Sequence, residues 1–172
     1  MKPSIVVEAE RYIGQREIPG LKSNPWVVAL WYNAASWLAN GKPADDSTVP
    51  WCGAFVRFVV MLCGWKPPAK WWSARSWLSW GVPVDFPCVG AVAIYDRPGE
   101  GAHVTIIAGQ RSDGALMGIG GNQGDAVSLA PFPRSRVAIG YRLPPGSVVP
   151  ALAILPVIAQ AGAAATSPTR EA

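Results

Sequence analysis

The stretch STVPWCGAFVRF, residues 47–58, leads from a polar loop into an apolar run with helical spacing. Cys52 follows a proline and a tryptophan and opens this run, which we expect to form a helix over 52–63. The start of a helix leaves N–H groups unpaired and carries a partial positive charge, and both features stabilise a thiolate. Two alternatives follow for Cys52. It is either a small buried side chain, the usual role of a free cysteine, or a nucleophile with a lowered pKa.

Outward from this helix, the chain divides into a helical first half and a strand-rich second half. The spacing of apolar residues predicts further helices over 4–13, 25–40 and 73–81. Short alternating runs bounded by Gly, Pro, Asp or Ser predict strands over 88–95, 103–109, 115–120, 126–130 and 136–142. Helices followed by antiparallel strands are typical of an α+β domain, and we expect the helices to pack on one sheet.

This domain is expected to span residues 1–146, because no repeat or linker divides that part of the chain. Residues 147–172 form a separate tail, which is apolar from Val148 onward and ends in the polar sequence TSPTREA. The apolar part approaches the length of a membrane-spanning helix, but Pro150 and Pro156 interrupt it. A tail packed on the domain and a tail in contact with a membrane are the two alternatives.

The composition argues against several classes of function. Half of the 172 residues are hydrophobic and 15% are charged, which is typical of a folded domain and not of a disordered chain. The net charge of +4 favours an anionic partner, but the cations are scattered and no nucleic-acid-binding motif is present, so we expect no nucleic-acid partner. A single histidine and three cysteines without paired spacing predict no metal site, no cofactor and no disulfide framework. The N-terminus lacks the apolar core of a signal peptide, so we expect synthesis in a cytoplasm.

The lone histidine, His103, begins one predicted strand, and Asn122 follows the end of the next. If these two strands pair as a hairpin in simple register, His103 and Asn122 lie close together. A cysteine nucleophile requires a base that removes the thiol proton and a third group that orients the imidazole. Cys52, His103 and Asn122 supply these groups and are the candidate catalytic residues. Cys63 and Cys88 are expected to be buried.

The same residues lie in segments that resemble the papain-like peptidoglycan hydrolases, the CHAP and NlpC-type superfamily. More narrowly, the chain is similar to a group of small endolysin-like phage proteins. The matching segments are YIGQREIPG, PWCGAFV, HVTIIAG, GGNQGDAVS and GYRLP, which together span about residues 10–145 in the family's order. Two stretches depart from the family's pattern: Ala91 stands where an aspartate is common, and Ala102 and Thr105 stand where glycines are common.

The resemblance implies a papain-like fold, with the nucleophile at a helix start and a C-terminal antiparallel sheet. It implies a cysteine amidohydrolase or peptidase that cleaves the stem peptide or cross-link of bacterial peptidoglycan through a thioester. Carried over by motif, Cys52 is the nucleophile, His103 the general base and Asn122 the orienting residue. Trp51 and Gln123 are candidate substrate-binding residues, and for Trp51 the alternative is a place in the core. The enzyme is expected to act as a monomer in the cell wall or periplasm, without metal or cofactor, during phage lysis.

Three other readings of the sequence stay open, one of which is a structural phage component that digests the wall during entry. A secreted effector directed against competing bacteria would use the same cleavage. A non-catalytic wall-binding module would use its aromatic residues to grip the polymer and leave Cys52 inert. Which peptidoglycan bond is cut depends on the shape of the groove, and the sequence leaves that choice open.

Overall fold

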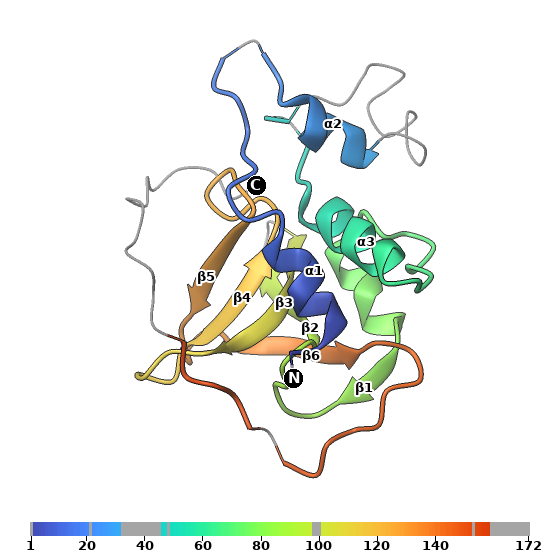
Figure 1. Ribbon diagram of the computed structural model, residues 1–172, viewed down its shortest axis with the longest axis vertical. Coiled ribbons are helices and arrows are strands. Elements are labelled where there is room, and N and C mark those ends of the chain that lie inside the picture. Colours follow the sequence, from blue (N-terminus) through green and yellow to red (C-terminus); the bar gives the residue numbers. More distant parts are fainter. Residues whose placement is uncertain are drawn as a thin grey trace.

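In the part of the chain that the structure describes, six antiparallel strands form one sheet and short helices cover one of its faces (Figure 1). The computed structural model describes residues 2–20, 22–31, 46–47, 49–97, 101–152 and 154–158. The helices are α1 (Ser4–Glu10), α2 (Pro25–Trp31), α3 (Cys52–Leu62) and the 3-10 helix η1 (Ala74–Ser79). The strands are β1 (Val82–Val84), β2 (Val92–Arg97), β3 (Gly101–Gln110), β4 (Leu116–Gly120), β5 (Ser128–Phe132) and β6 (Ala138–Leu143). Their order in the sheet is β1-β6-β2-β3-β4-β5. The predicted α+β class is therefore confirmed.

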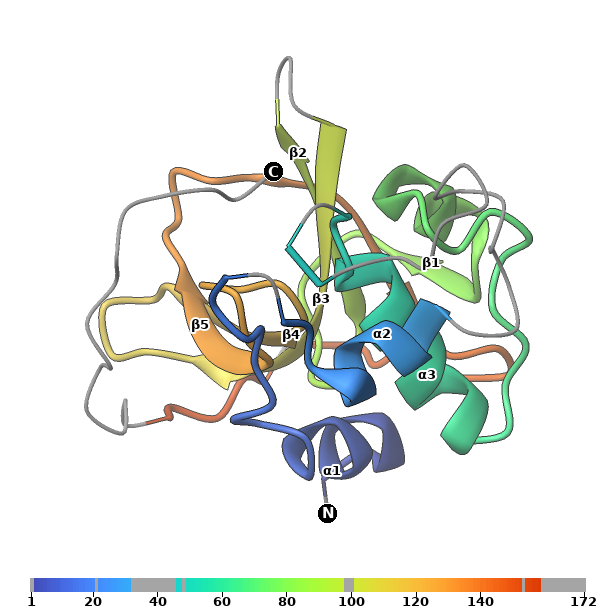
Figure 2. The same ribbon diagram turned by 90° about the horizontal axis from the view of Figure 1, so that it is seen from above.

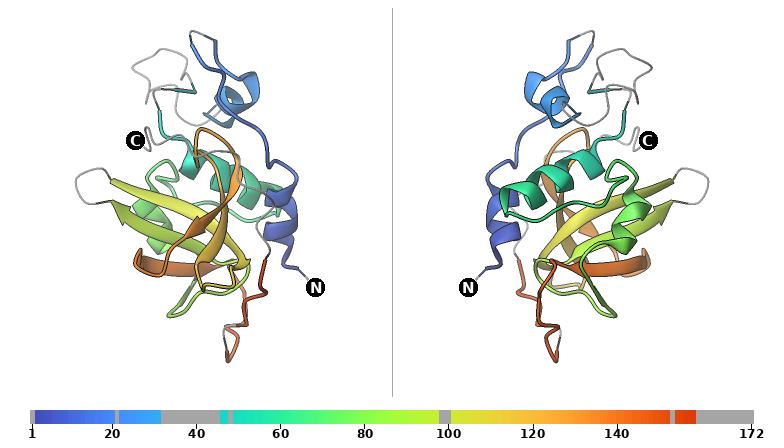
Figure 3. Two further views of the ribbon diagram at one scale, coloured as in Figure 1. Left: turned by 90° about the vertical axis from the view of Figure 1, so that its left-hand side faces the viewer. Right: turned by 90° about the vertical axis from the view of Figure 1, so that its right-hand side faces the viewer.

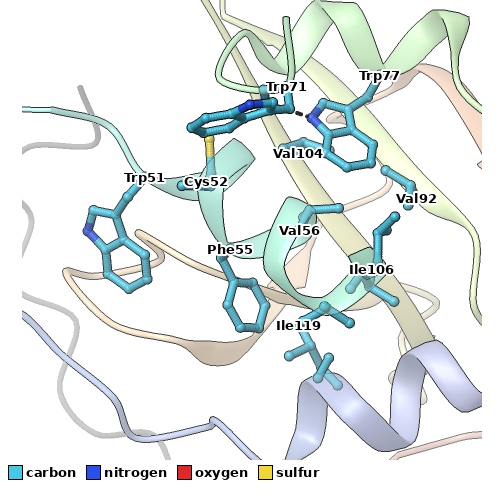
Figure 4. Packing of buried hydrophobic residues seen from close by; sticks show 14 of the residues in the cluster. Trp51, Cys52, Phe55, Val56, Trp71, Trp77, Val92, Val104, Ile106 and Ile119 are labelled. Carbon is cyan, nitrogen blue, oxygen red and sulfur yellow. Dashed lines mark hydrogen bonds between the residues drawn. The ribbon is translucent and has the colours of Figure 1, made fainter. Parts of the chain in front are cut away.

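The central helix, α3, packs on β3 through one apolar stripe. The members of the stripe have helical spacing and are fully buried: Phe55, Val56, Val59 and Val60. They belong to the same core cluster as Val104 and Ile106 of β3 (Figure 4). Helix α1 lies beside α3 on this side of the strands (Figure 3), and α2 packs against α3 (Figure 2). The helical half of the chain thus covers one face of the sheet.

The opposite face of the sheet has its own smaller core. Side chains alternate between the faces along a strand, so His103, Thr105 and Ile107 of β3 point away from α3. Tyr95 of β2 lies opposite His103 on this second face. The ring of Phe132 in β5 stacks on Tyr95 with a centroid distance of 4.4 Å, although β3 and β4 lie between their strands. The sheet is therefore strongly curled around this face.

Most predicted elements are found, with shifted ends. The first helix stops at Glu10, before the predicted end at 13. Asn24 begins α2 as predicted, because its side-chain Oδ1 accepts from the N–H of Trp26 at 2.9 Å. The end predicted for this helix, at 40, lies outside the described residues. The segment 73–81 forms a 3-10 helix instead of an α-helix, and it leads into strand β1, which the sequence pattern did not predict. A strand of three residues is too short to show a period of two.

The first part of the predicted tail lies along the domain. The N–H of Gln110 donates to Pro156 O at 3.0 Å, and the N–H of Ile158 donates to Gln110 O at 2.8 Å. This pairing continues the end of β3, while the side chains of Val148, Leu152, Ile154 and Val157 stay exposed. Residues 159–172 lie outside the described part, so the membrane contact stays a prediction for them. No helix among the described residues has the length and apolar character needed to cross a bilayer.

We predict that Ile106→Ala lowers the free energy of unfolding by about 2–5 kcal/mol, because it leaves a cavity between α3 and the sheet. Ile106 is 0% exposed, whereas Ile154 is 82% exposed and provides a matched control in which the same atoms are removed. Ile154→Ala should change stability by less than about 0.5 kcal/mol. Urea unfolding followed by tryptophan fluorescence measures both values. Equal effects of the two substitutions would contradict the assigned core.

Candidate functional site

Cys52 is the first residue of α3, and its sulfur lies among backbone N–H groups. The N–H groups of Val104, Gly53 and Cys52 itself act on the sulfur and favour the thiolate. The side chain is nevertheless only 6% exposed. In Figure 4 the sulfur points toward the ring of Trp71, and the Trp77 indole donates to Trp71 O at 2.9 Å. The predicted nucleophile thus lies at the start of a helix, but the ring of Trp71 covers its sulfur.

The contact with Val104 exists because strand β4 ends early. The N–H and C=O of Ile107 bond to the β2 side, so in the alternation along β3 the N–H of Val104 points toward β4. Toward that end, the last residues of β3 and β4 that pair are Ile106 and Ile119, and β4 ends at Gly120. No β4 residue therefore pairs with Val104 in the described sheet. The sulfur of Cys52 takes the place of the missing carbonyl partner.

The loop after β4 continues beside this position and packs on the start of α3. A Cβ at Gly121 would lie 2.6 Å from the Cβ of Phe55 and 2.6 Å from the ring of Trp51, so only glycine fits there. The N-terminal segment holds the other end of the loop, because the N–H of Val127 donates to Gln15 O at 2.7 Å. The loop is fixed from both sides.

Gln123, in this loop, orients His103. The ring nitrogen Nε2 of His103 lies 3.0 Å from Gln123 Oε1. The Nε2 group of Gln123 donates to Gly118 O at 3.2 Å and to Ser128 O at 2.7 Å, so the amide oxygen must be the atom that faces the ring. Nε2 of His103 is therefore the protonated nitrogen, and Nδ1 is left with the lone pair of a base.

This geometry corrects the prediction for Asn122. The side chain that contacts the imidazole is that of Gln123, and no hydrogen bond joins Asn122 to the ring among the described residues. Asn122 has φ of 55°, a left-handed conformation that asparagine tolerates better than most residues. The turn at Asn122 brings Gln123 back toward β3. Gln123, predicted as a substrate contact, is 6% exposed, and its amide forms hydrogen bonds with His103 and with two backbone carbonyls.

The other predicted substrate contact, Trp51, belongs to the core. Its side chain is 0% exposed, and its indole nitrogen donates to Glu17 Oε1 at 2.7 Å. A residue without exposed surface cannot form the wall of an open groove, so this prediction is wrong for the structure as it stands. Trp71, which lies over the sulfur, is also nearly buried, at 5% exposed.

Burial governs the charge state of both candidate catalytic groups. Desolvation raises the pKa of the Cys52 thiol, and the N–H of Val104 and the charge of Arg97 offset only part of this effect. Desolvation also lowers the pKa of His103 to about 3, against the hydrogen bond that the ring donates to Gln123, which raises it. The lowered pKa expected for a nucleophilic Cys52 is therefore not found, because at neutral pH the thiol and the imidazole are both uncharged.

Arg97 is a site residue that the sequence did not single out. It ends β2 opposite Gly101, and its positive charge lowers the pKa of both Cys52 and His103. For the thiol this favours the reactive anion, and for the imidazole it favours the neutral base. No motif marks this arginine, because its relevance depends on the pairing of β2 with β3.

The sulfur of Cys52 contacts β3 at the residue next to His103, but no hydrogen bond joins the sulfur to the imidazole among the described residues. The sulfur meets the N–H of Val104, the residue after His103, whereas the imidazole lies on the opposite face and stacks on Phe132 at 5.8 Å. Since β4 is absent at this point, this edge of β3 has no strand partner, although the loop after β4 lies along it.

The other two cysteines, Cys63 and Cys88, pack against core residues. Cys88 is 5% exposed and its sulfur lies 3.6 Å from Phe86 O, as the prediction of burial requires. Cys63 is only partly buried at the end of α3, where it packs against the core. All three cysteines are free thiols. Among the described residues, no three His, Cys, Asp or Glu side chains are grouped as a metal ion would need.

Comparisons with known proteins add no relative to this picture. No protein-family model matches the chain, and no curated protein or solved structure is detectably similar to it. The site must therefore be interpreted from its own geometry.

We predict that the protein becomes less stable as the pH is lowered from about 6.5 to about 3, because of His103. Its pKa is lowered from 6.5 to about 3 in the folded protein, so in this window the unfolded chain binds the extra proton. The contribution is complete above the unfolded pKa and is lost as the pH falls, by up to about 1.4 kcal/mol per pH unit. Urea unfolding at several pH values should show a shallower dependence for His103→Gln. Identical slopes for the two proteins would contradict a neutral, buried imidazole.

Proposed function

We propose that the protein is a papain-like cysteine hydrolase that cleaves amide bonds in the peptides of bacterial peptidoglycan. The observation that carries the proposal is the tautomer of His103. Gln123 accepts from Nε2, which leaves Nδ1 as a base, at the strand position beside the N–H that the Cys52 sulfur contacts. A nucleophile at a helix start, an imidazole with its free nitrogen and an amide that orients it are the three parts of such a site.

The chemistry proposed here starts from an uncharged pair. The Nδ1 atom of His103 takes the thiol proton as the sulfur of Cys52 attacks the amide carbonyl, because neither group is charged beforehand. The bond from carbon to nitrogen then breaks, the amine leaves with the proton from Nδ1, and a thioester remains. Water gives a proton to Nδ1 as it attacks the thioester, the bond from carbon to sulfur breaks, and Nδ1 returns the proton to the sulfur, which restores the thiol. The carboxylic acid that is released loses its proton to the solvent.

The proposal requires a local movement before the reaction. The sulfur and the imidazole must meet at the open edge of β3, and Trp71 must uncover the sulfur for a peptide to reach it. The ring of Trp71 packs against Trp31 at 5.4 Å and lies under the guanidinium of Arg57 at 4.8 Å. We propose that binding of the peptide displaces this ring.

The substrate class rests on two properties of the chain. The five sequence segments that surround Cys52, His103 and Asn122 resemble cell-wall hydrolases, and the net charge of +4 favours an anionic polymer. Phage lysis and attack on competing bacteria are both compatible with this activity. A membrane contact of the tail belongs to the same proposal.

A non-catalytic wall-binding protein is the second candidate, and burial favours it. Cys52 and His103 are 6% and 2% exposed, values that suit core residues. Alkylation with iodoacetamide separates the two functions. A hydrolase loses its release of soluble muropeptides after alkylation, whereas a binding module retains all of its affinity for purified sacculi.

We predict that Cys52→Ala reduces the release of muropeptides from purified sacculi by at least about a thousandfold, because the covalent step is lost. Cys63→Ala, which removes a thiol at the far end of the same helix, should keep activity within about twofold of the wild type. Mass spectrometry of the products identifies the bond. Undiminished release by a folded Cys52→Ala protein would rule out this nucleophile.

We predict opposite outcomes for the two neighbouring amides. Gln123→Ala should reduce activity by about a hundredfold or more, because the imidazole loses the group that selects its tautomer. Asn122→Gly should retain most of the activity, since glycine readily adopts the φ of 55° found there. Circular dichroism establishes that both variants are folded. The reverse order of activities would return the orienting role to Asn122.

A further inference from the structure

The second face of the sheet carries a pocket that the proposed reaction does not use. It has a volume of about 240 Å³ and opens near the ends of β5 and β6, away from α3. Its main walls are Leu116, Phe132, Arg134, Arg136, Tyr141 and Leu155. Leu155 comes from the tail, which Gln110 holds against this side through the pairing that continues β3. The pocket therefore depends on the tail for one of its walls.

Two cations at this pocket have no anion to balance them. Within the described residues, neither Arg134 nor Arg136 forms an ion pair with a carboxylate. The guanidinium of Arg136 lies 5.3 Å from the ring centroid of Phe132 and 5.4 Å from that of Tyr95. Aromatic faces hold a guanidinium in place and leave its N–H groups free to bind an anion.

Behind the wall formed by Phe132, the fully buried ring of Tyr95 stacks on Phe132 and also lies next to the guanidinium of Arg136. Tyr95 itself is not a wall of the pocket. The pocket combines the positive charge of Arg134 and Arg136 with apolar walls from Leu116, Phe132 and Leu155.

We propose that this pocket binds a small carboxylate with an apolar body, such as the C-terminal residue of a peptide. The fork of an arginine matches the two oxygens of a carboxylate, and the apolar walls accept the side chain next to it. The volume of about 240 Å³ suits one or two residues and excludes a polymer strand. This site is separate from Cys52 and would exist even if the proposed hydrolysis were wrong.

Occupancy of the pocket should be felt at His103. The ring of Phe132 forms a pocket wall and also stacks on the imidazole, with 5.8 Å between the two centroids. The charges of Arg97 and Arg136 both lower the pKa of His103, and Gln123 is its hydrogen-bond partner. A carboxylate on Arg136 offsets one of these charges and makes the imidazole a stronger base. The protein has a single histidine, so one resonance reports the event.

The test is a titration followed through the ring Cε1–H resonance of His103 in carbon–proton correlation spectra. N-acetyl-L-leucine should move this resonance to a saturable limit in the millimolar range or below. N-acetyl-L-leucinamide, which lacks the carboxylate, should not move it, and inorganic phosphate should bind at least tenfold more weakly because it lacks the apolar body. No saturable shift, or equal affinity for the leucinamide or for phosphate, would overturn the proposal.

Charge variants assign the site independently of catalysis. Arg134→Gln and Arg136→Gln should each weaken the binding of N-acetyl-L-leucine at least tenfold, by calorimetry and by the same resonance. Arg11→Gln, which removes an exposed charge just after α1, is the control and should leave the affinity unchanged. If Arg136→Gln does not fold, Arg134→Gln still decides the question, since Arg134 is exposed. Equal affinity in Arg134→Gln and Arg11→Gln would place the carboxylate elsewhere.

Discussion

The early end of strand β4 is the feature on which the candidate site depends. If β4 continued past Gly120, it would pair with Val104 and close the edge of β3. Because it stops, the sulfur of Cys52 meets the N–H of Val104, and the following loop is free to bring the amide of Gln123 to His103. Gly121 completes this arrangement, since no other residue allows the loop so close to Trp51 and Phe55.

Burial gives this site a different character from that of an ion-pair thiol enzyme. A helix start favours a thiolate, but the desolvation of Cys52 outweighs the N–H groups around it. The imidazole is also kept neutral, and the charge of Arg97 acts in that direction. Because the thiol stays protonated, such a site contains no resting thiolate that could be oxidised. Its reactivity would arise only when a substrate reorganises the cover formed by Trp71.

The two faces of the sheet have separate roles in this interpretation. The helix-covered face holds most of the core and fixes the position of Cys52, whereas the curled second face surrounds His103 with Tyr95, Thr105 and Phe132. The pocket at Arg134 and Arg136 opens on that second face. The imidazole therefore lies between the loop that follows β4 on one side and the pocket proposed to bind a carboxylate on the other.

The local pattern of the sequence determined α3, the position of Cys52 at its start and the change from helices to strands. These features depend on periodicity and on turn residues that act over a few positions. Only the tertiary structure decided that Gln123 and not Asn122 reaches His103, since this depends on the left-handed conformations of Asn122, Gly124 and Asp125 in the loop. Contacts between segments distant in sequence likewise determine the burial of Trp51 and the neutral state of the thiol. They also determine the effect of the Arg97 charge on Cys52 and His103. Desolvation and strand alternation are properties of the packed molecule, so the order of residues along the chain does not reveal them.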